Sequence, residues 1–218
     1  MVSTFIIIPA YNEEKHISDV INGVRKYCRN IVVVDDGSKD KTYEIAKNTK
    51  AVVLHHIVNL GKGAAMQTGC DFALKKGAKI LVMIDSDMQH KPKDIPKLLS
   101  AMKERDIIFT YRKFNRKMPF VFKLGNGIIN KVIKWLYGIE VKDSQCGFRA
   151  FTASAYRKIK WRARDYSVET EMIVNAGKHR LKYAEVPIET IYLDTYKGTN
   201  LQDGIKIFRN VLLLRLRR

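Results

Sequence analysis

The sequence lacks several features that would place it in other classes of protein. No apolar stretch among its 218 residues approaches the roughly 18 that a helix needs to cross a bilayer. Cysteines are few, with no Cys-x-x-Cys pair and no histidine at ligand spacing. These absences argue against a membrane-spanning chain, a zinc module and a disulfide framework. We expect Cys28, Cys70 and Cys146 to be reduced, structural thiols in a protein that faces the cytosol.

Acidic residues are scarce overall and absent from 107 to 139. The chain has 40 Lys and Arg against 22 Asp and Glu, a net charge of +18, which predicts attraction to nucleic acid, an anionic membrane face or phosphorylated substrates. Large apolar residues interleave with lysine and arginine at about 112–138, the composition of an amphipathic segment on an anionic interface. The alternative is a solvated basic face over ordinary core. The basic residues of this segment are Arg112, Lys113, Arg116, Lys117, Lys123, Lys131 and Lys134.

Apolar runs of strand length alternate with helical patterns through the first half of the chain. The run at 5–9 has no basic segment before it, so it predicts a first strand and not a signal peptide. The βαβ order predicts an α/β fold with a mostly parallel central sheet flanked by helices, in a single domain over 1–218. Further strands are expected at 31–34, 51–54, 80–84, 106–110 and 181–188, and helices at 17–28, 64–76, 95–102 and, with a basic character, about 201–218.

Two of the predicted strands end in paired carboxylates. The strand at 80–84 leads into Asp85-Ser86-Asp87, and the strand at 31–34 leads into Asp35-Asp36. Because ligands in open α/β sheets bind at the carboxyl ends of strands, these acids lie where a site is expected. Two carboxylates one residue apart repel each other unless a cation lies between them, and hard oxygen ligands suit Mg²⁺ or Mn²⁺. The pattern favours a metal-bound phosphate ester as substrate.

Three further motifs have both a functional and a structural interpretation. After the first strand, Tyr11 could stack on a nucleobase and Glu13 could accept a hydrogen bond from a base or ribose, or Asn12 could simply cap a helix. Asp36 could bind the same nucleotide or belong to a tight turn. The stretch Gly61-Lys62-Gly63 lacks the G-x-x-x-x-G-K-[ST] pattern of a phosphate loop, and a glycine turn that packs a helix onto the sheet is favoured.

Five motifs together resemble those of family 2 glycosyltransferases with the GT-A fold, and specifically the polyprenyl-phosphate (dolichyl-phosphate) sugar synthases. The motifs occur in order and span nearly the whole chain. They lie at 9–14, 35–42, 59–65, 85–90 and 143–149. The resemblance implies a GT-A, Rossmann-like fold for nucleotide-diphospho-sugar transfer.

The resemblance also implies roles for individual residues. A divalent Mg²⁺ or Mn²⁺ ion would be held by Asp85, Asp87 and Gln89. Arg112 would face the donor diphosphate or the acceptor phosphate, and Asp143 is the candidate for an acid, a base or a sugar-orienting carboxylate; with Asp87 they form the catalytic set. The residues implied to bind the donor and the acceptor side are Pro9, Tyr11, Glu13, Asp36, Asp85, Ser86, Arg149, Glu171 and Lys197.

Some positions leave alternatives open. Arg149 could equally be a structural partner of a nearby acid. His90 could be a base or could equally have a structural role. The loop at 191–200 departs from the Arg and Gly-Lys-Ser-Lys run of the better-known synthases, and Lys197 is the phosphate contact implied there. The sequence ends at Arg218 without the transmembrane helices that many relatives append, so attachment is expected at the membrane surface.

The resemblance implies metal-dependent, inverting transfer of a sugar from a nucleotide-diphosphate sugar, with GDP-mannose favoured, to a polyprenyl or dolichyl phosphate. We expect a cytoplasmic protein, peripheral at the cytosolic membrane face, that meets an anionic membrane surface. A lipid monophosphate is mostly dianionic at pH 7, so a dedicated base is optional. The alternatives are a UDP-sugar-dependent transferase acting on a soluble glycan or polysaccharide and a basic nucleic-acid-binding module. No recognition motif accompanies the charge, so no nucleic-acid partner is expected.

Overall fold

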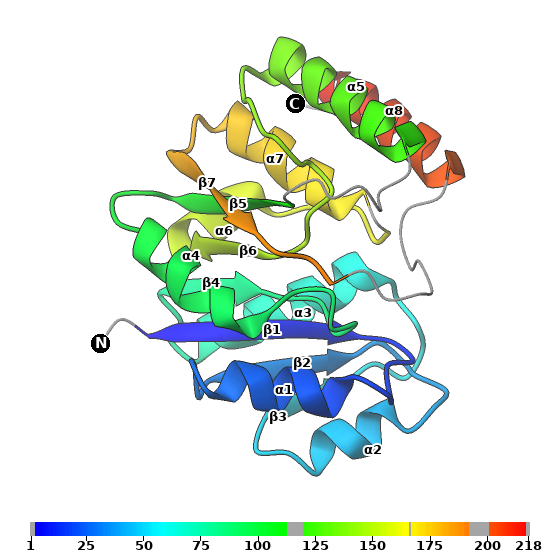
Figure 1. Cartoon of the computed structure of the whole chain (residues 1–218), viewed down its shortest axis with the longest axis vertical. Coiled ribbons are helices and arrows are strands. Elements are labelled where there is room, and N and C mark those ends of the chain that lie inside the picture. The colour runs from blue at the N-terminus through cyan, green and yellow to red at the C-terminus, as the bar shows by residue number, and fades with distance from the viewer. Residues whose placement is uncertain (1–2, 113–119, 166, 192–200, 217–218) are drawn as a thin grey trace.

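The computed structural model describes residues 3–112, 120–165, 167–191 and 201–216. Seven strands in these residues form one sheet in the order β3-β2-β1-β4-β6-β5-β7 (Figure 1). In the sheet, β6 runs antiparallel to β4 and β5, and the other pairs are parallel, which confirms the predicted mostly parallel sheet. The strands are β1 (Thr4–Ala10), β2 (Ile31–Asp35), β3 (Val52–His55), β4 (Ile80–Met83), β5 (Ile107–Arg112), β6 (Arg149–Thr152) and β7 (Tyr183–Ile188).

Helices cover both faces of the sheet. The core on one face includes side chains of α1, α2 and α4, and the core on the other includes side chains of α3, α5, α6, α7 and α8. In Figure 1, α1 lies in front of the sheet and α3 behind it. The helices are α1 (Ile17–Arg25), α2 (Thr42–Lys47), α3 (Lys62–Lys75), α4 (Ile95–Ala101), α5 (Phe120–Tyr137), α6 (Ala153–Ile159), α7 (Val168–Lys178) and α8 (Leu201–Leu216), with a 3₁₀ turn at Pro92–Asp94.

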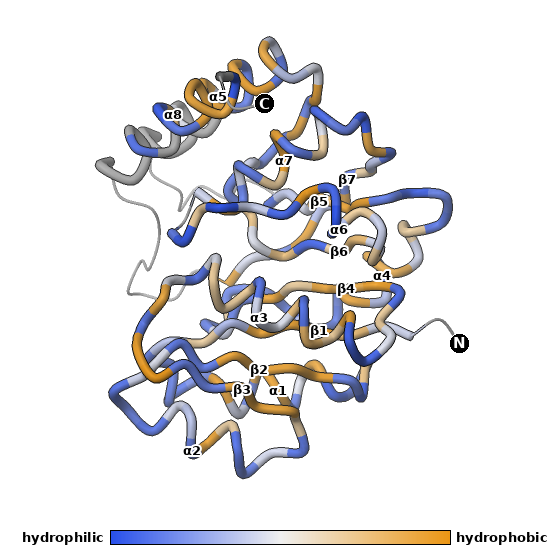
Figure 2. The backbone as a smooth tube through the Cα atoms, turned by 180° about the vertical axis from the view of Figure 1, so that it is seen from behind, coloured by the Kyte–Doolittle hydropathy of each residue, from blue (hydrophilic) through white to orange (hydrophobic). Residues whose placement is uncertain are grey.

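The central strands are buried on both faces, which is why they are continuous apolar runs in the sequence. In β1, Ile6 and Ile8 belong to the core under α1, and Ile7 belongs to the core under α3. All three side chains are completely buried, and each such burial stabilises the fold by about 1.5–3 kcal/mol. Figure 2 shows β1 and β2 largely in the colour of hydrophobic residues. This core aligns the carboxyl ends of β1, β2 and β4 at one edge.

Two long helices, α5 and α8, lie side by side at one end of the molecule (Figure 1). The predicted amphipathic segment at 112–138 corresponds to the end of β5 and to α5, and its residues 113–119 lie outside the described part of the chain. Among the described residues, no helix combines the length and the apolar character needed to cross a bilayer. The cysteines are free thiols, as expected.

Candidate active site

A cavity of about 560 Å³ lies at the carboxyl ends of β1, β2 and β4. This is the edge at which an open α/β sheet binds its ligands. Of the predicted site residues, Asp143, Arg149 and Glu171 do not line the cavity, and Lys197 lies outside the described residues. The predicted residues that do line it are Pro9, Tyr11, Glu13, Asp36, Asp85, Ser86, Asp87, Gln89 and Arg112.

The loop after β1 is tied to the loop after β2 by short hydrogen bonds. The backbone N–H of Asn12 donates to Ser38 Oγ at 2.9 Å, and the N–H of Glu13 donates to Thr42 Oγ1 at 2.7 Å. Asn12 has a φ of 54° and accepts from the Lys39 N–H at 2.8 Å. Helix α1 begins only at Ile17, so Asn12 is not its cap but a connection between the two loops. The connection holds one wall of the cavity.

Asp36 organises the turn that precedes α3. Its Oδ1 accepts from the Leu60 N–H at 3.0 Å, and its Oδ2 accepts from the Gly61 N–H at 2.8 Å. The Nδ1 atom of His56 lies 2.7 Å from Oδ1 of the same carboxylate. Asp36 lines the cavity although only 2% of it is exposed. A group bound to Asp36 would therefore contact the residue that positions the start of α3.

Gly61 is required by both backbone conformation and space. Its φ is +94°, in the left-handed region, and a Cβ there would collide with the carbonyl of Arg164. Gly63 donates to that carbonyl at 3.0 Å and accepts from Trp161 Nε1 at 2.8 Å. Helix α3 packs on the sheet, as predicted, but the glycines at its start pack against the segment before α7.

The carboxylates of the Asp85-Ser86-Asp87 motif differ in their surroundings. Asp85 Oδ1 lies 2.7 Å from Lys62 Nζ, and Oδ2 lies 3.4 Å from His90 Nδ1. Burial raises the pKa of Asp85, but the charges of Lys62, His90 and Arg149 and the hydrogen bond from Lys62 together lower it. Burial and the charge of Asp85 raise the pKa of Asp87, whose Oδ1 accepts from the Gln89 N–H at 3.0 Å. Among the described residues, Asp85 is paired with a lysine and Asp87 has no comparable ion pair.

Lys62 and Glu169 belong to this site, although sequence reasoning did not assign them to it. Lys62 Nζ lies 2.8 Å from Glu169 Oε1 and 2.7 Å from Asp85 Oδ1. Lys62 and Glu169 both line the cavity. Burial lowers the pKa of Lys62, but the charges of Asp85 and Glu169 raise it overall. The available signal was a lysine between two glycines at the expected start of a helix.

The residues at this edge fit a divalent metal ion. Burial, and after it the negative charge of Asp85, raise the pKa of Asp87, and a bound cation would stabilise its ionised form. No group of three or more His, Cys, Asp or Glu side chains is gathered for a metal in the part of the chain that the structure describes. Mg²⁺ is commonly held by one or two carboxylates together with substrate phosphates, so Asp85 and Asp87 with Gln89 suffice on the protein side.

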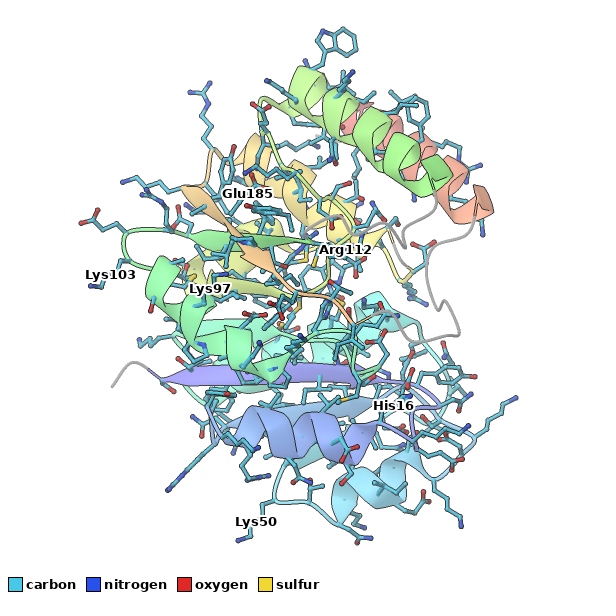
Figure 3. The ribbon with its side chains drawn as sticks, viewed as in Figure 1. His16, Lys50, Lys97, Lys103, Arg112 and Glu185 are labelled. Carbon is cyan, nitrogen blue, oxygen red and sulfur yellow. The ribbon has the colours of Figure 1, made fainter. Side chains whose placement is uncertain are left out.

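Arg112 lies at the end of β5 (Figure 3) and is fixed by a two-point ion pair. Its Nε lies 2.7 Å from Asp143 Oδ2, and its NH2 lies 3.1 Å from Asp143 Oδ1. Burial raises the pKa of Asp143, but the Arg112 guanidinium holds it below its usual value. The Asp143 side chain is fully buried behind Arg112, so its proposed role as acid or base stays a prediction. The geometry supports a positioning role for Asp143 instead.

The remaining predicted residues lie beneath the cavity wall. Arg149 is fully buried and donates to the carbonyls of Cys146 at 2.8 Å, Ser144 at 3.1 Å and Glu169. Glu171 accepts from the Ala163 N–H at 2.8 Å and lines a separate, smaller cavity. Both therefore hold the segments that form the wall, and any direct contact with a substrate stays a prediction.

His90 is buried under the Asp85-Ser86-Asp87 motif. Its ring packs 5.4 Å from that of Phe148, and its Nε2 lies 3.7 Å from Cys146 Sγ. Burial opposes its charged form, but the contact with Cys146 and the charges of Asp85 and Asp87 raise its pKa. His90 thus packs beneath the motif and also lines the cavity, and a role as a base stays a prediction.

Comparisons with known proteins show the family of this chain. Residues 5–161 match the model of the family described as glycosyl transferase family 2. An uncharacterised protein of Methanocaldococcus jannaschii is 40% identical over 97% of this chain and 92% of its own length. A UDP-N-acetylglucosamine–dolichyl-phosphate N-acetylglucosaminyltransferase of Methanococcus voltae is 38% identical over 97% of this chain and 96% of its own length.

The fold also matches solved structures. A glucosyl-3-phosphoglycerate synthase of Mycobacterium tuberculosis, in complex with Mg²⁺ and UDP, has a TM-score of 0.77 at 22% identity. The match covers 98% of this chain and 79% of that one. The chain therefore belongs to glycosyl transferase family 2 and has the GT-A fold.

Proposed function

We propose that this glycosyltransferase moves a sugar from a nucleotide-diphosphate sugar to a polyprenyl phosphate. The observation that carries the proposal is that Asp85 and Asp87 share one cavity with Arg112. Paired carboxylates suit a metal-bound diphosphate, and a fixed guanidinium suits a second phosphate group. A donor diphosphate and an acceptor phosphate would therefore each meet a complementary group in one cavity.

The donor that we propose to test first is UDP-N-acetylglucosamine. The support is the similarity to the Methanococcus voltae transferase, whose name states that donor and a dolichyl-phosphate acceptor. Tyr11, 40% exposed at the cavity, is available to stack on a uracil or a guanine. The preference for GDP-mannose stays a prediction that the same experiment tests.

The chemistry needs few groups beyond those that hold the substrates. A divalent ion, when bound to Asp85, Asp87 and Gln89, supplies Lewis-acid stabilisation of the departing diphosphate. Arg112, held in place by Asp143, brings a guanidinium group to the cavity for the acceptor phosphate. That phosphate is mostly dianionic at pH 7, so it can attack the anomeric carbon without a base. Attack from the side opposite the diphosphate inverts the configuration at that carbon.

An acceptor on a lipid requires the cavity to meet a membrane, and we propose α5 and α8 as the contact. Their exposed apolar side chains include Trp135, 82% exposed, and Ile128, 47% exposed, on α5. Phe208, Leu212 and Leu213 are the corresponding side chains on α8. The exposed basic residues of the two helices include Lys131, Lys134, Lys206, Arg209 and Arg215. Apolar and basic side chains together suit an anionic interface, and each basic residue contributes about 1 kcal/mol near such a leaflet.

A thermal-shift panel tests the donor side of this proposal. The protein is heated with UDP-N-acetylglucosamine, UDP-glucose or GDP-mannose, each with and without Mn²⁺. A ligand that binds only the folded state raises the melting temperature by mass action. We expect a Mn²⁺-dependent rise with UDP-N-acetylglucosamine. A rise with GDP-mannose alone would favour GDP-mannose as the donor, as predicted from the sequence. No rise with any donor would contradict the proposed site.

A further inference from the structure

The ammonium of Lys62 occupies the position between two acids that face the cavity. Its Nζ lies 2.7 Å from Asp85 Oδ1 and 2.8 Å from Glu169 Oε1, and only 3% of the Glu169 side chain is exposed. The Lys62 side chain is itself 23% exposed, so the group borders the cavity and is not sealed in the core. Asp85 is thus already neutralised by a cation that belongs to the protein.

The Lys62 ammonium can leave Asp85 while it keeps its ion pair with Glu169. The backbone before it is fixed, because Gly61 is held by Asp36 and by its close approach to Arg164. Beyond that fixed backbone, the side chain carries its ammonium on a flexible four-carbon stem. Glu169 Oε2 is buried and has no hydrogen-bond partner among the described residues, so this carboxylate keeps unused capacity to hold the ammonium. The ammonium can therefore pivot on Glu169.

We propose that Lys62 is an internal counter-ion that keeps Asp85 paired until the donor arrives, and so makes metal binding depend on the donor diphosphate. A metal ion that arrives alone must compete with Lys62 for Asp85. A diphosphate in the same cavity offers Lys62 another anion and leaves Asp85 to the metal. This inference rests on the proposed function, because it assumes that the cavity receives a nucleotide diphosphate.

Replacing the ammonium by an apolar group of similar length tests the proposal. Mn²⁺ is titrated into Lys62→Met and the unchanged protein, without nucleotide and then with UDP, and free Mn²⁺ is measured by electron paramagnetic resonance. We expect Lys62→Met to bind Mn²⁺ alone at least about fivefold more tightly than the unchanged protein does. Fivefold is the lower limit of the affinity changes that coupled sites usually show. The factor by which UDP tightens Mn²⁺ binding should fall correspondingly.

Two controls separate this effect from a general change of charge or fold. Lys103→Met removes the same charge from an exposed residue that Figure 3 labels beyond α4, away from Arg112, and should leave Mn²⁺ binding unchanged. Lys62→Arg keeps a cation and should keep most of the coupling between UDP and Mn²⁺. If Lys62→Met does not fold, the double variant Lys62→Met with Glu169→Gln has the net charge of the natural chain and should also bind Mn²⁺ alone more tightly.

Equal Mn²⁺ affinity in Lys62→Met and the unchanged protein would overturn the proposal, as would an equal gain in Lys103→Met. Neither titration requires a sugar or a lipid acceptor. Failure to transfer a sugar to polyprenyl phosphate would therefore count against the proposed function alone, while unchanged Mn²⁺ binding would count against the role of Lys62 alone.

Discussion

Gly147 lies against the carboxylate of Asp85, so close that a Cβ atom at position 147 would be 2.7 Å from Oδ2 and 3.1 Å from Oδ1. A real Cβ cannot occupy that space unless the carboxylate moves. The residue at position 147 thus limits the positions that the Asp85 carboxylate can take beside Lys62. The motif at 143–149 thereby shapes the edge of the cavity at which Asp85 lies.

Gly147→Ala should slow sugar transfer strongly while the protein still folds. The added methyl group displaces Asp85, and a displacement of about 1 Å near a reacting centre can cost on the order of 100-fold in rate. The measurement is kcat with saturating donor and acceptor, together with the melting temperature. Gly127→Ala, where a Cβ would meet nothing within 4 Å, is the matched control and should keep full activity. Equal rates in the two variants would show that the Asp85 position is not critical.

The Arg112–Asp143 pair predicts a stability that depends on pH. Because the folded protein holds the pKa of Asp143 below its usual value of about 3.9, the ionised pair stabilises the fold above that pH and loses its effect as pH falls through the lowered pKa. Asp143→Asn should therefore lower the free energy of unfolding by about 1.5–3 kcal/mol at pH 7 and by less near pH 3.

Urea unfolding at both pH values measures this difference. Asp71→Asn is the control, since the Asp71–Lys160 pair is about half exposed and such pairs contribute about 0–1 kcal/mol. A loss in Asp143→Asn that is the same at pH 7 and pH 3 would mean that the charge of Asp143 is not what stabilises the fold.

The surface formed by α5 and α8 predicts binding to anionic membranes. Trp135→Ser removes an aromatic side chain that is 82% exposed and should reduce co-sedimentation with liposomes that contain anionic lipid. The binding of the natural chain should weaken as salt is raised, because charges on exposed groups are screened beyond about 10 Å at 0.1 M. Tyr27→Ser, at an aromatic residue 42% exposed on another part of the molecule, should not affect sedimentation. Failure of the natural chain to sediment at low salt would contradict the proposed contact.

The strands and the carboxylates at their ends could be predicted because their cause is local. A parallel strand buried on both faces must be an unbroken apolar run, and the residues after it must lie at the edge of the sheet. This reasoning placed Asp36, Asp85 and Asp87 at one cavity. The same logic missed β6, because a four-residue strand that begins with Arg149 has no apolar pattern long enough to detect.

Contacts between distant segments could not be predicted from local patterns. The pairing of Lys62 with Glu169 depends on how the start of α7 approaches the start of α3 in the folded chain, which no spacing in the sequence reports. The burial of Arg149 depends on three backbone carbonyls that converge only in the folded chain. In α8, Val211 is buried whereas the apolar side chains of Phe208 and Leu212 are exposed, a difference that depends on what packs against the helix.

Sugar transfer to a polyprenyl phosphate should depend on Asp87, and a transfer assay tests this directly. Radiolabelled UDP-N-acetylglucosamine, UDP-glucose or GDP-mannose is incubated with the protein, Mn²⁺ and either a polyprenyl phosphate or a soluble oligosaccharide. Asp87→Asn and removal of Mn²⁺ by a chelator are the controls, with circular dichroism to confirm that the variant folds. We expect label from one donor in the organic phase with polyprenyl phosphate, and none in either control. Label only in the soluble oligosaccharide, or turnover that persists in Asp87→Asn or without metal, would contradict the account.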